Sequence, residues 1–117
     1  MAQGSRRHQL TGAGAFEAVL RSGRRRDGEY LEIIAMAAAR DYGRVGMVIG
    51  RKALPRAVDR NRVRRMLRVV LRDARPAIGN YDLIVRLKRG APRTAFPLIA
   101  ADAARLLASV AMQSRSP

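Results

Sequence analysis

The amino-acid sequence predicts a small α+β sandwich, in which helices pack on a central sheet in the approximate order α-β-β-(β)-α-β-α. Three observations support this fold class. The segments 44–50 and 81–87 are apolar enough to form buried strands. A long segment between them carries apolar residues at helical spacing. The chain has 117 residues and 48% hydrophobic content, which suits one domain with a modest core.

The first element is expected to be a short helix. It should begin at Thr11 or Gly12 and end at Gly23, with Phe16, Val19 and Leu20 on one face. Glycines near its start weaken a helix, so this one needs support from packing.

Three segments follow this helix. Residues 24–28 are rich in arginine and are expected to be a charged loop, either solvated or in contact with a polyanion. Residues 30–37 and 44–50 are expected to be strands, separated by a turn at 41–43. These two strands could pair as an antiparallel hairpin.

The segment after residue 55 predicts a long basic helix. It is expected to begin between Pro55 and Val58 and to end near Arg75, before Pro76. One side of this helix carries an apolar stripe that spans an arc of roughly 140°. The stripe consists of Val63, Met66, Leu67, Val70 and Leu71. Arginines occupy the neighbouring arc, so the helix can bury one side and present the other to a polyanion.

These arginines are placed unfavourably for the stability of the helix. Arg60 and Arg62 lie near its N-terminus, where cations oppose the helix dipole, and Arg60 and Arg64 are like charges at i,i+4 spacing. Each such conflict costs roughly 0.2–1 kcal/mol. A solvated cationic surface is one interpretation. The density and placement of the charges favour another, in which guanidinium groups bind phosphates, because the planar fork suits them.

The C-terminal third is expected to hold one strand and one helix. Residues 81–87 are expected to form a strand, in which Tyr81, Leu83, Val85 and Leu87 alternate with Asp82, Ile84 and Arg86. A last helix is expected from Thr94, as its N-cap, to about Val110. We expect a single domain over residues 10–111, with flexible tails at 1–9 and 112–117.

The charge of the chain limits its function. It has 24 basic and 9 acidic residues, a net charge of +15, which points to nucleic acid and more weakly to an anionic membrane surface. It has no cysteine and one histidine, so thiolate metal sites and a Ser-His-Asp triad are not expected. No run of about 18 apolar residues predicts a membrane span. A cytoplasmic protein is expected.

Four segments of the chain, taken in order, resemble one known family. Residues 57–68, AVDRNRVRRMLR, resemble the RNR signature of the bacterial ribonuclease P protein subunit. Residues 44–52, RVGMVIGRK, resemble the strand that precedes that signature in the family. The resemblance extends to Leu10–Gly23, with Phe16 in an aromatic position, and to residues 81–85, YDLIV. It covers nearly the whole chain.

The resemblance implies a protein that binds a large catalytic RNA and the 5′ leader of precursor tRNA. The holoenzyme removes the leader by hydrolysing one phosphodiester bond, with the RNA as catalyst and as the main holder of the required Mg²⁺. One protein per RNA is expected, no metal or catalytic residue is expected in the protein, and no membrane is involved. The resemblance also implies a left-handed βαβ crossover, against the general right-handed rule.

The resemblance also implies which residues bind RNA. The RNR helix would contact the catalytic RNA through Arg60, Asn61, Arg62, Arg64, Arg65 and Arg68. Arg51 and Lys52 would lie at the edge of the same surface. A cleft between the sheet and the first helix would hold the leader, lined by Phe16, Leu20, Ile34 and Met47. Aromatic residues are only 4% of the chain, so leader binding would depend more on phosphate contacts than on base stacking.

Three other functions are compatible with parts of the sequence. A ribosomal or ribosome-associated RNA-binding protein would explain the charge and size, but not the ordered match of four segments. A DNA-binding regulator could insert the basic helix into a major groove, although no second helix at turn spacing supports it. A self-sufficient nuclease would need converging carboxylates, and the nine acidic residues show no such cluster.

Overall fold

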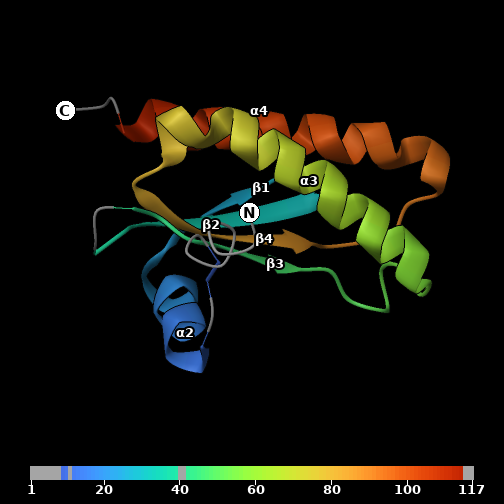
Figure 1. Ribbon diagram of the computed structural model, residues 1–117, viewed down its shortest axis with the longest axis horizontal. Helices are drawn as coiled ribbons and strands as arrows, with labels where there is room; N and C mark the ends of the chain where they lie inside the picture. The colour runs from blue at the N-terminus through green and yellow to red at the C-terminus, as the bar shows by residue number, and fades with distance from the viewer. Residues whose placement is uncertain (1–8, 11, 40–41, 115–117) are drawn as a thin grey trace.

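The structure, a computed structural model, describes residues 9–10, 12–39 and 42–114 and is a four-stranded sheet flanked by helices (Figure 1). The strands are β1 (Arg24–Asp27), β2 (Leu31–Ala37), β3 (Val45–Val48) and β4 (Tyr81–Leu87). The helices are α2 (Ala13–Ser22), α3 (Ala57–Ile78) and α4 (Phe96–Ser114), the last preceded by a 3₁₀ turn, η1 (Arg93–Ala95). The expected α+β class and element order are confirmed, with β1 as the additional strand.

The sheet has the order β1-β2-β4-β3. β2 pairs antiparallel with both β1 and β4, and β3 pairs parallel with β4. The expected hairpin between residues 30–37 and 44–50 is therefore wrong, because β4 lies between these two strands. β4 takes the central position since it is apolar on both faces, with Leu83, Ile84 and Val85 all buried. β3, α3 and β4 form a βαβ unit, whose left-handed sense stays an expectation.

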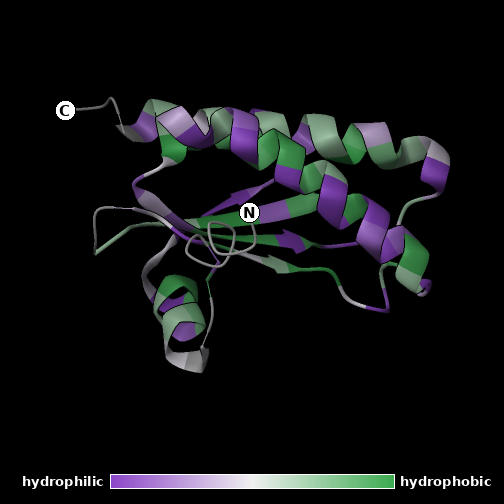
Figure 2. Cartoon of the chain, in the orientation of Figure 1, coloured by the Kyte–Doolittle hydropathy of each residue, from purple (hydrophilic) through white to green (hydrophobic). Residues whose placement is uncertain are grey.

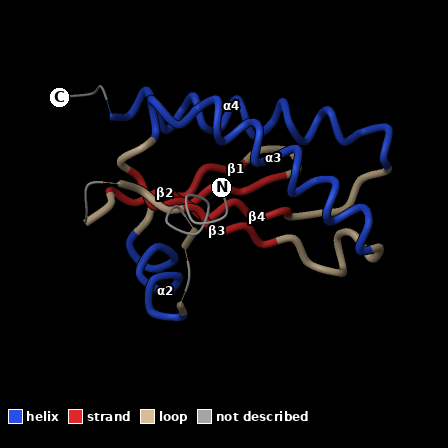
Figure 3. The backbone as a smooth tube through the Cα atoms, in the orientation of Figure 1, coloured by secondary structure: helices blue, strands red, loops and turns tan. Residues whose placement is uncertain are grey.

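The helices form layers on opposite faces of the sheet. α3 and α4 lie side by side over one face, and α2 lies against the other (Figures 1 and 3). The larger core lies under α3 and α4 and includes Leu31, Ile33 and Val85. A smaller core lies under α2 and contains Leu10, Val19, Ile34 and Ile84. Alternate residues of β2 and β4 thus enter different cores.

The boundaries of several elements differ from those expected. Residues 24–27, expected in a loop, form β1, because their backbone pairs with β2. α3 continues past Arg75 and includes Pro76 in its last turn. Thr94, expected as the N-cap of the last helix, lies inside η1, and Pro92 holds the N-cap position of that turn.

Both expected tails overlap with ordered structure. Residues 112–114, expected in the C-terminal tail, belong to α4. At the other end, Gln9 bridges Val45 in parallel fashion, while residues 1–8 and 115–117 lie outside the described residues.

Asp102 of α4 fixes the turn between β1 and β2. Its carboxylate accepts hydrogen bonds from the backbone N–H groups of Glu29, Tyr30 and Leu31, at 3.2, 3.0 and 3.0 Å. Arg105 donates a further hydrogen bond at 2.7 Å. Burial alone would raise the pKa of Asp102, but these hydrogen bonds outweigh it and hold the pKa below its usual value. One side chain therefore attaches the β1–β2 turn to α4.

The segment Arg93–Gln113 is long and apolar enough to cross a membrane by length and composition alone. In the folded chain this segment is a core helix. Ile99, Ala103 and Leu107 are buried in the larger core, and the charged Asp102 lies within the segment.

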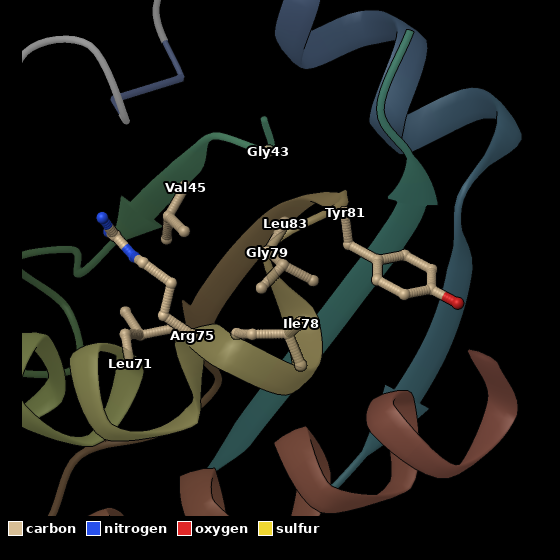
Figure 4. A pocket seen from close by; sticks show the side chains of 8 residues that line it. All are labelled: Gly43, Val45, Leu71, Arg75, Ile78, Gly79, Tyr81 and Leu83. Atoms are coloured by element: carbon tan, nitrogen blue, oxygen red, sulfur yellow. The ribbon is translucent and has the colours of Figure 1, made fainter. Parts of the chain in front are cut away.

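A small cavity lies where β3, the end of α3 and the start of β4 meet (Figure 4). Its volume is about 30 Å³, and Val45, Leu71, Arg75 and Tyr81 are among its lining residues. A space of this size accommodates about one water molecule. It is therefore too small for a nucleotide.

Candidate nucleic-acid interface

α3 separates its apolar and cationic sides as the sequence predicts. Val63, Leu67 and Leu71 are buried in the larger core. The other side exposes arginines, and we call four of them, Arg62, Arg65, Arg68 and Arg72, the exposed arginine row. Asn61, also exposed, lies beside them. Figure 2 shows the hydrophilic bands that recur along α3. The helix can therefore contact several phosphates without losing its own packing.

Arg60 and Arg64 are only partly exposed. Nη1 of Arg60 donates hydrogen bonds to the carbonyl oxygens of Leu54 and Pro55, at 2.9 and 2.8 Å. Nη1 of Arg64 lies 3.4 Å from Oδ1 of Asn61, within the helix. Arg60 therefore has a structural contact that its place in the RNR motif did not predict.

Arg51 and Lys52 lie in an exposed turn immediately before α3. The turn is closed by the N–H group of Leu54, which donates to the carbonyl of Gly50 at 3.1 Å. The loop after β4 reaches the same place, because a Cβ added to Gly90 would lie 2.2 Å from the carbonyl oxygen of Ala53. The turn that holds Arg51 and Lys52, the basic loop after β4 and the start of α3 thus lie together at one end of the molecule.

The face of the sheet under α2 carries part of the expected leader cleft. Phe16 is half-buried, and Leu20 is 42% exposed at the edge of α2. The Phe16 ring lies against the backbone of Gly46 in β3. Ile34 is on this face but fully buried under α2, so it offers no surface to a ligand.

Met47 does not belong to the same cleft. It packs against the larger core under α3 and α4, whereas Phe16 packs against the smaller core under α2. The two residues therefore lie on opposite faces of the sheet, since successive side chains of a strand alternate. On β3 the exposed residue of the α2 face is Val48.

Beyond the end of α2, the same face carries a charged cluster that the sequence reasoning missed. We call this part the open face and define it by Arg25, Glu32, Val48 and Arg86. Arg25 pairs with Ile34 across the strands, and Glu32 pairs with Arg86, which itself pairs with Val48. Period-two counting from Ile34 and Ile84 would have placed Glu32 and Arg86 there.

Glu32 is the buried centre of this cluster. It is 6% exposed, and its Oε1 atom lies 3.2 Å from Nη1 of Arg25 and 3.1 Å from Nη2 of Arg86. Both arginine side chains are 50% exposed.

Asp27 in β1 and Asp82 in β4 also pair with cations. Asp82 pairs with Arg44 at 3.9 Å, and Lys88 pairs with Asp27 at 3.2 Å. Among the described residues, no group of three or more His, Cys, Asp or Glu side chains could hold a metal ion. The chemistry that this part of the chain offers is binding of anions by arginine.

The comparison with known families decides the identity of the chain. The model of the family described as Ribonuclease P matches residues 5–111. The chain belongs to the ribonuclease P protein family. A ribonuclease P protein is a subunit of the endoribonuclease that matures the 5′ ends of tRNA.

Relatives and solved structures agree with this assignment. The ribonuclease P protein component of Nitrosococcus oceani is 34% identical over 85 residues, covering 73% of this chain and 71% of that protein. The component from a Synechococcus species is 37% identical over 105 residues, covering 86% and 79%.

Solved structures share the fold. The RNase P protein from Thermotoga maritima matches with a TM-score of 0.68 and 22% identity, over 85% of this chain and 94% of that one. A Staphylococcus aureus RNase P protein mutant with defective mRNA degradation activity matches with a TM-score of 0.76 and 17% identity, over 93% and 92%.

Proposed function

We propose that this ribonuclease P protein binds the catalytic RNA through α3 and the turn before it, and binds the 5′ leader of precursor tRNA on the α2 side of the sheet. The observation that supports the first contact is the exposed arginine row, which faces away from the core. Asn61, Arg60 and Arg64 flank the row, and Arg51 and Lys52 extend it.

The mechanism is electrostatic and positional. Cations that neutralise phosphates release counterions, so each contact adds roughly 0.7–0.9 to the slope of log affinity against log salt. Contacts with about six phosphates would therefore make RNA binding steeply salt-dependent. With part of its phosphate charge neutralised by the protein, the catalytic RNA could bind precursor tRNA and Mg²⁺ more tightly. The Mg²⁺ ions supply the hydrolytic chemistry and are held by the RNA, while the protein orients the substrate.

The leader contact gives the protein a preference for precursor over product. Mature tRNA has no leader, so contacts at Phe16, Leu20 and the open face favour the substrate. We further propose one protein per RNA and action in the cytoplasm, where the RNA and precursor tRNA are made.

Reconstitution tests this proposal. The purified protein is mixed with a bacterial ribonuclease P RNA, and leader removal is measured at low Mg²⁺. We expect cleavage by the mixture and none by the protein alone. A protein that fails to stimulate a matched RNA, but binds ribosomal RNA, would instead support a ribosome-associated role.

A further inference from the structure

The open face holds two guanidinium groups beside each other. Arg25 lies on β1 and Arg86 on β4, and both contact the same oxygen of Glu32 on β2, the strand between them. Since both nitrogens lie 3.1–3.2 Å from one oxygen, the two groups are close neighbours despite their positive charge. Without the carboxylate they would repel each other.

The carboxylate does not use up the hydrogen-bonding capacity of these arginines. Each guanidinium has five N–H donors, and one nitrogen of each contacts Glu32. Within the described part of the chain, Oε1 of Glu32 has charge contacts but no aligned hydrogen bond. Half of each arginine side chain is exposed. The remaining donors are therefore available to a ligand on the open face.

The position of the cluster fits a single-stranded RNA ligand. Val48, opposite Arg86, ends β3, and the chain continues directly to Arg51, Lys52 and α3. A single-stranded RNA leader lying on the open face could thus continue toward the catalytic RNA bound at α3. Phe16 is the aromatic residue that packs in the core of this face, so stacking platforms are few. Phosphate binding is the recognition that the surface offers.

We propose that Arg25 and Arg86 together bind a phosphate of the 5′ leader, and that Glu32 is a positioning residue that holds their guanidinium groups for it. This inference rests on the proposed function. Two planar forks fixed next to each other can donate several hydrogen bonds to one phosphate group, which a single mobile arginine cannot. Recognition of the leader here would depend on its backbone rather than on its bases.

A substitution that removes the charge of Glu32 distinguishes two roles for this residue, because positioning of the arginines and screening of their charge predict opposite changes in affinity for precursor tRNA. Glu32→Gln removes a negative charge from the RNA-binding surface. If Glu32 only reduces the local positive potential, the variant should bind precursor tRNA more tightly. If Glu32 positions the arginines, the variant should bind precursor tRNA about three- to tenfold more weakly, as expected for loss of well-placed charged hydrogen bonds. Affinity for mature tRNA should not change in the positioning case.

The experiment measures dissociation constants of the reconstituted holoenzyme for precursor and mature tRNA. Glu29→Gln is the matched control, because Glu29 is an exposed acid that pairs with Arg89 at 3.2 Å, away from the open face. It should leave both constants unchanged. Unfolding temperature and affinity for the catalytic RNA verify that each variant is folded. Unchanged or tighter precursor binding by Glu32→Gln overturns the inference.

Leaders with single methylphosphonate substitutions locate the phosphate. With the wild-type protein, one neutral linkage should weaken binding about tenfold. With Arg86→Ala or Arg25→Ala, the same linkage should cause no further loss. Arg86→Lys keeps the charge without the fork and should behave like Arg86→Ala. Equal sensitivity at all linkages overturns the inference but not the leader-binding role, whereas failure of the wild-type protein to prefer precursor tRNA overturns both.

Discussion

The ring of Phe16 occupies the space in front of Gly46, where a Cβ atom on Gly46 would lie 2.5 Å from Cζ of Phe16. Real Cβ atoms do not approach a ring this closely, so the ring rests on bare backbone. This contact joins α2 to β3 and sets the position of the aromatic side chain at the edge of the proposed leader cleft.

Gly46→Ala should therefore displace the Phe16 ring. We expect the free energy of unfolding to fall by about 1–3 kcal/mol, as for other overpacked sites. The preference of the holoenzyme for precursor over mature tRNA should also fall. Gly50→Ala is the control, because a Cβ there meets nothing within 4 Å. If both variants keep the wild-type preference, the ring position does not matter to the leader.

Phe16→Ala should reduce the preference for precursor tRNA while leaving affinity for the catalytic RNA unchanged. The expected loss in precursor affinity is about 5- to 100-fold if the ring stacks on a base, since stacking contributes roughly 1–3 kcal/mol. Binding titrations with both tRNA forms measure it, and circular dichroism verifies the fold. Equal losses for precursor and mature tRNA would show that Phe16 acts through folding alone.

Arg65→Ala and Arg60→Ala should differ in their effects on stability. Arg65 is exposed in the arginine row, so its loss should weaken binding to the catalytic RNA and leave the unfolding temperature unchanged. Arg60 also holds two backbone carbonyls, so its loss should weaken RNA binding and destabilise the fold by about 1 kcal/mol. Gel-shift titration and thermal unfolding measure the two effects. Arg21→Ala is the control, because Arg21 is exposed on α2, on the other face of the sheet from α3. An equal loss of RNA binding in this variant would show that the effect depends on total charge and not on the arginine row.

Asp102 should make the stability of the fold depend on acid pH. Its pKa is lowered in the folded state, so its contribution is present above the unfolded-state pKa of about 3.9 and is lost as pH falls through the folded value. Asp102→Asn should reduce the free energy of unfolding at pH 7 by about 1–3 kcal/mol and flatten its acid dependence. Urea titrations between pH 7 and pH 3 measure both. Asp73→Asn, at an exposed position on α3, is expected to keep the wild-type acid dependence.

Local patterns predicted the helices and the central strand well, because helical spacing and alternation are local properties of the chain. The apolar side of α3 is the one expected from Val63, Leu67 and Leu71. Strand pairing was predicted less well, since it depends on segments far apart. β1 was not predicted because residues 24–27 are charged. Its backbone hydrogen bonds to β2 require no apolar side chains.

Among the residues expected to line the leader cleft, the prediction was wrong where it depended on which face of the sheet a strand residue occupies. Met47 and Gly46 are neighbours in sequence, yet they belong to opposite faces, and only the face of Gly46 carries Phe16, the expected aromatic residue of the leader cleft. The buried position of Ile34 depends on the docking of α2, which periodicity does not reveal. The ion pairs of Glu32 depend on the register of three strands, which became visible only in the folded chain.

The hydrogen bonds from Arg60 to Leu54 and Pro55 have a consequence for the thermodynamics of assembly. They join the turn of Arg51 and Lys52 to the first turns of α3, so the cations before the helix and those along it are held as one rigid unit. The conformational entropy of this segment is then lost during folding rather than on contact with RNA, which leaves more of the interaction energy for affinity. Association of the two subunits should accordingly be limited by diffusion and orientation, without a slow ordering step in the protein.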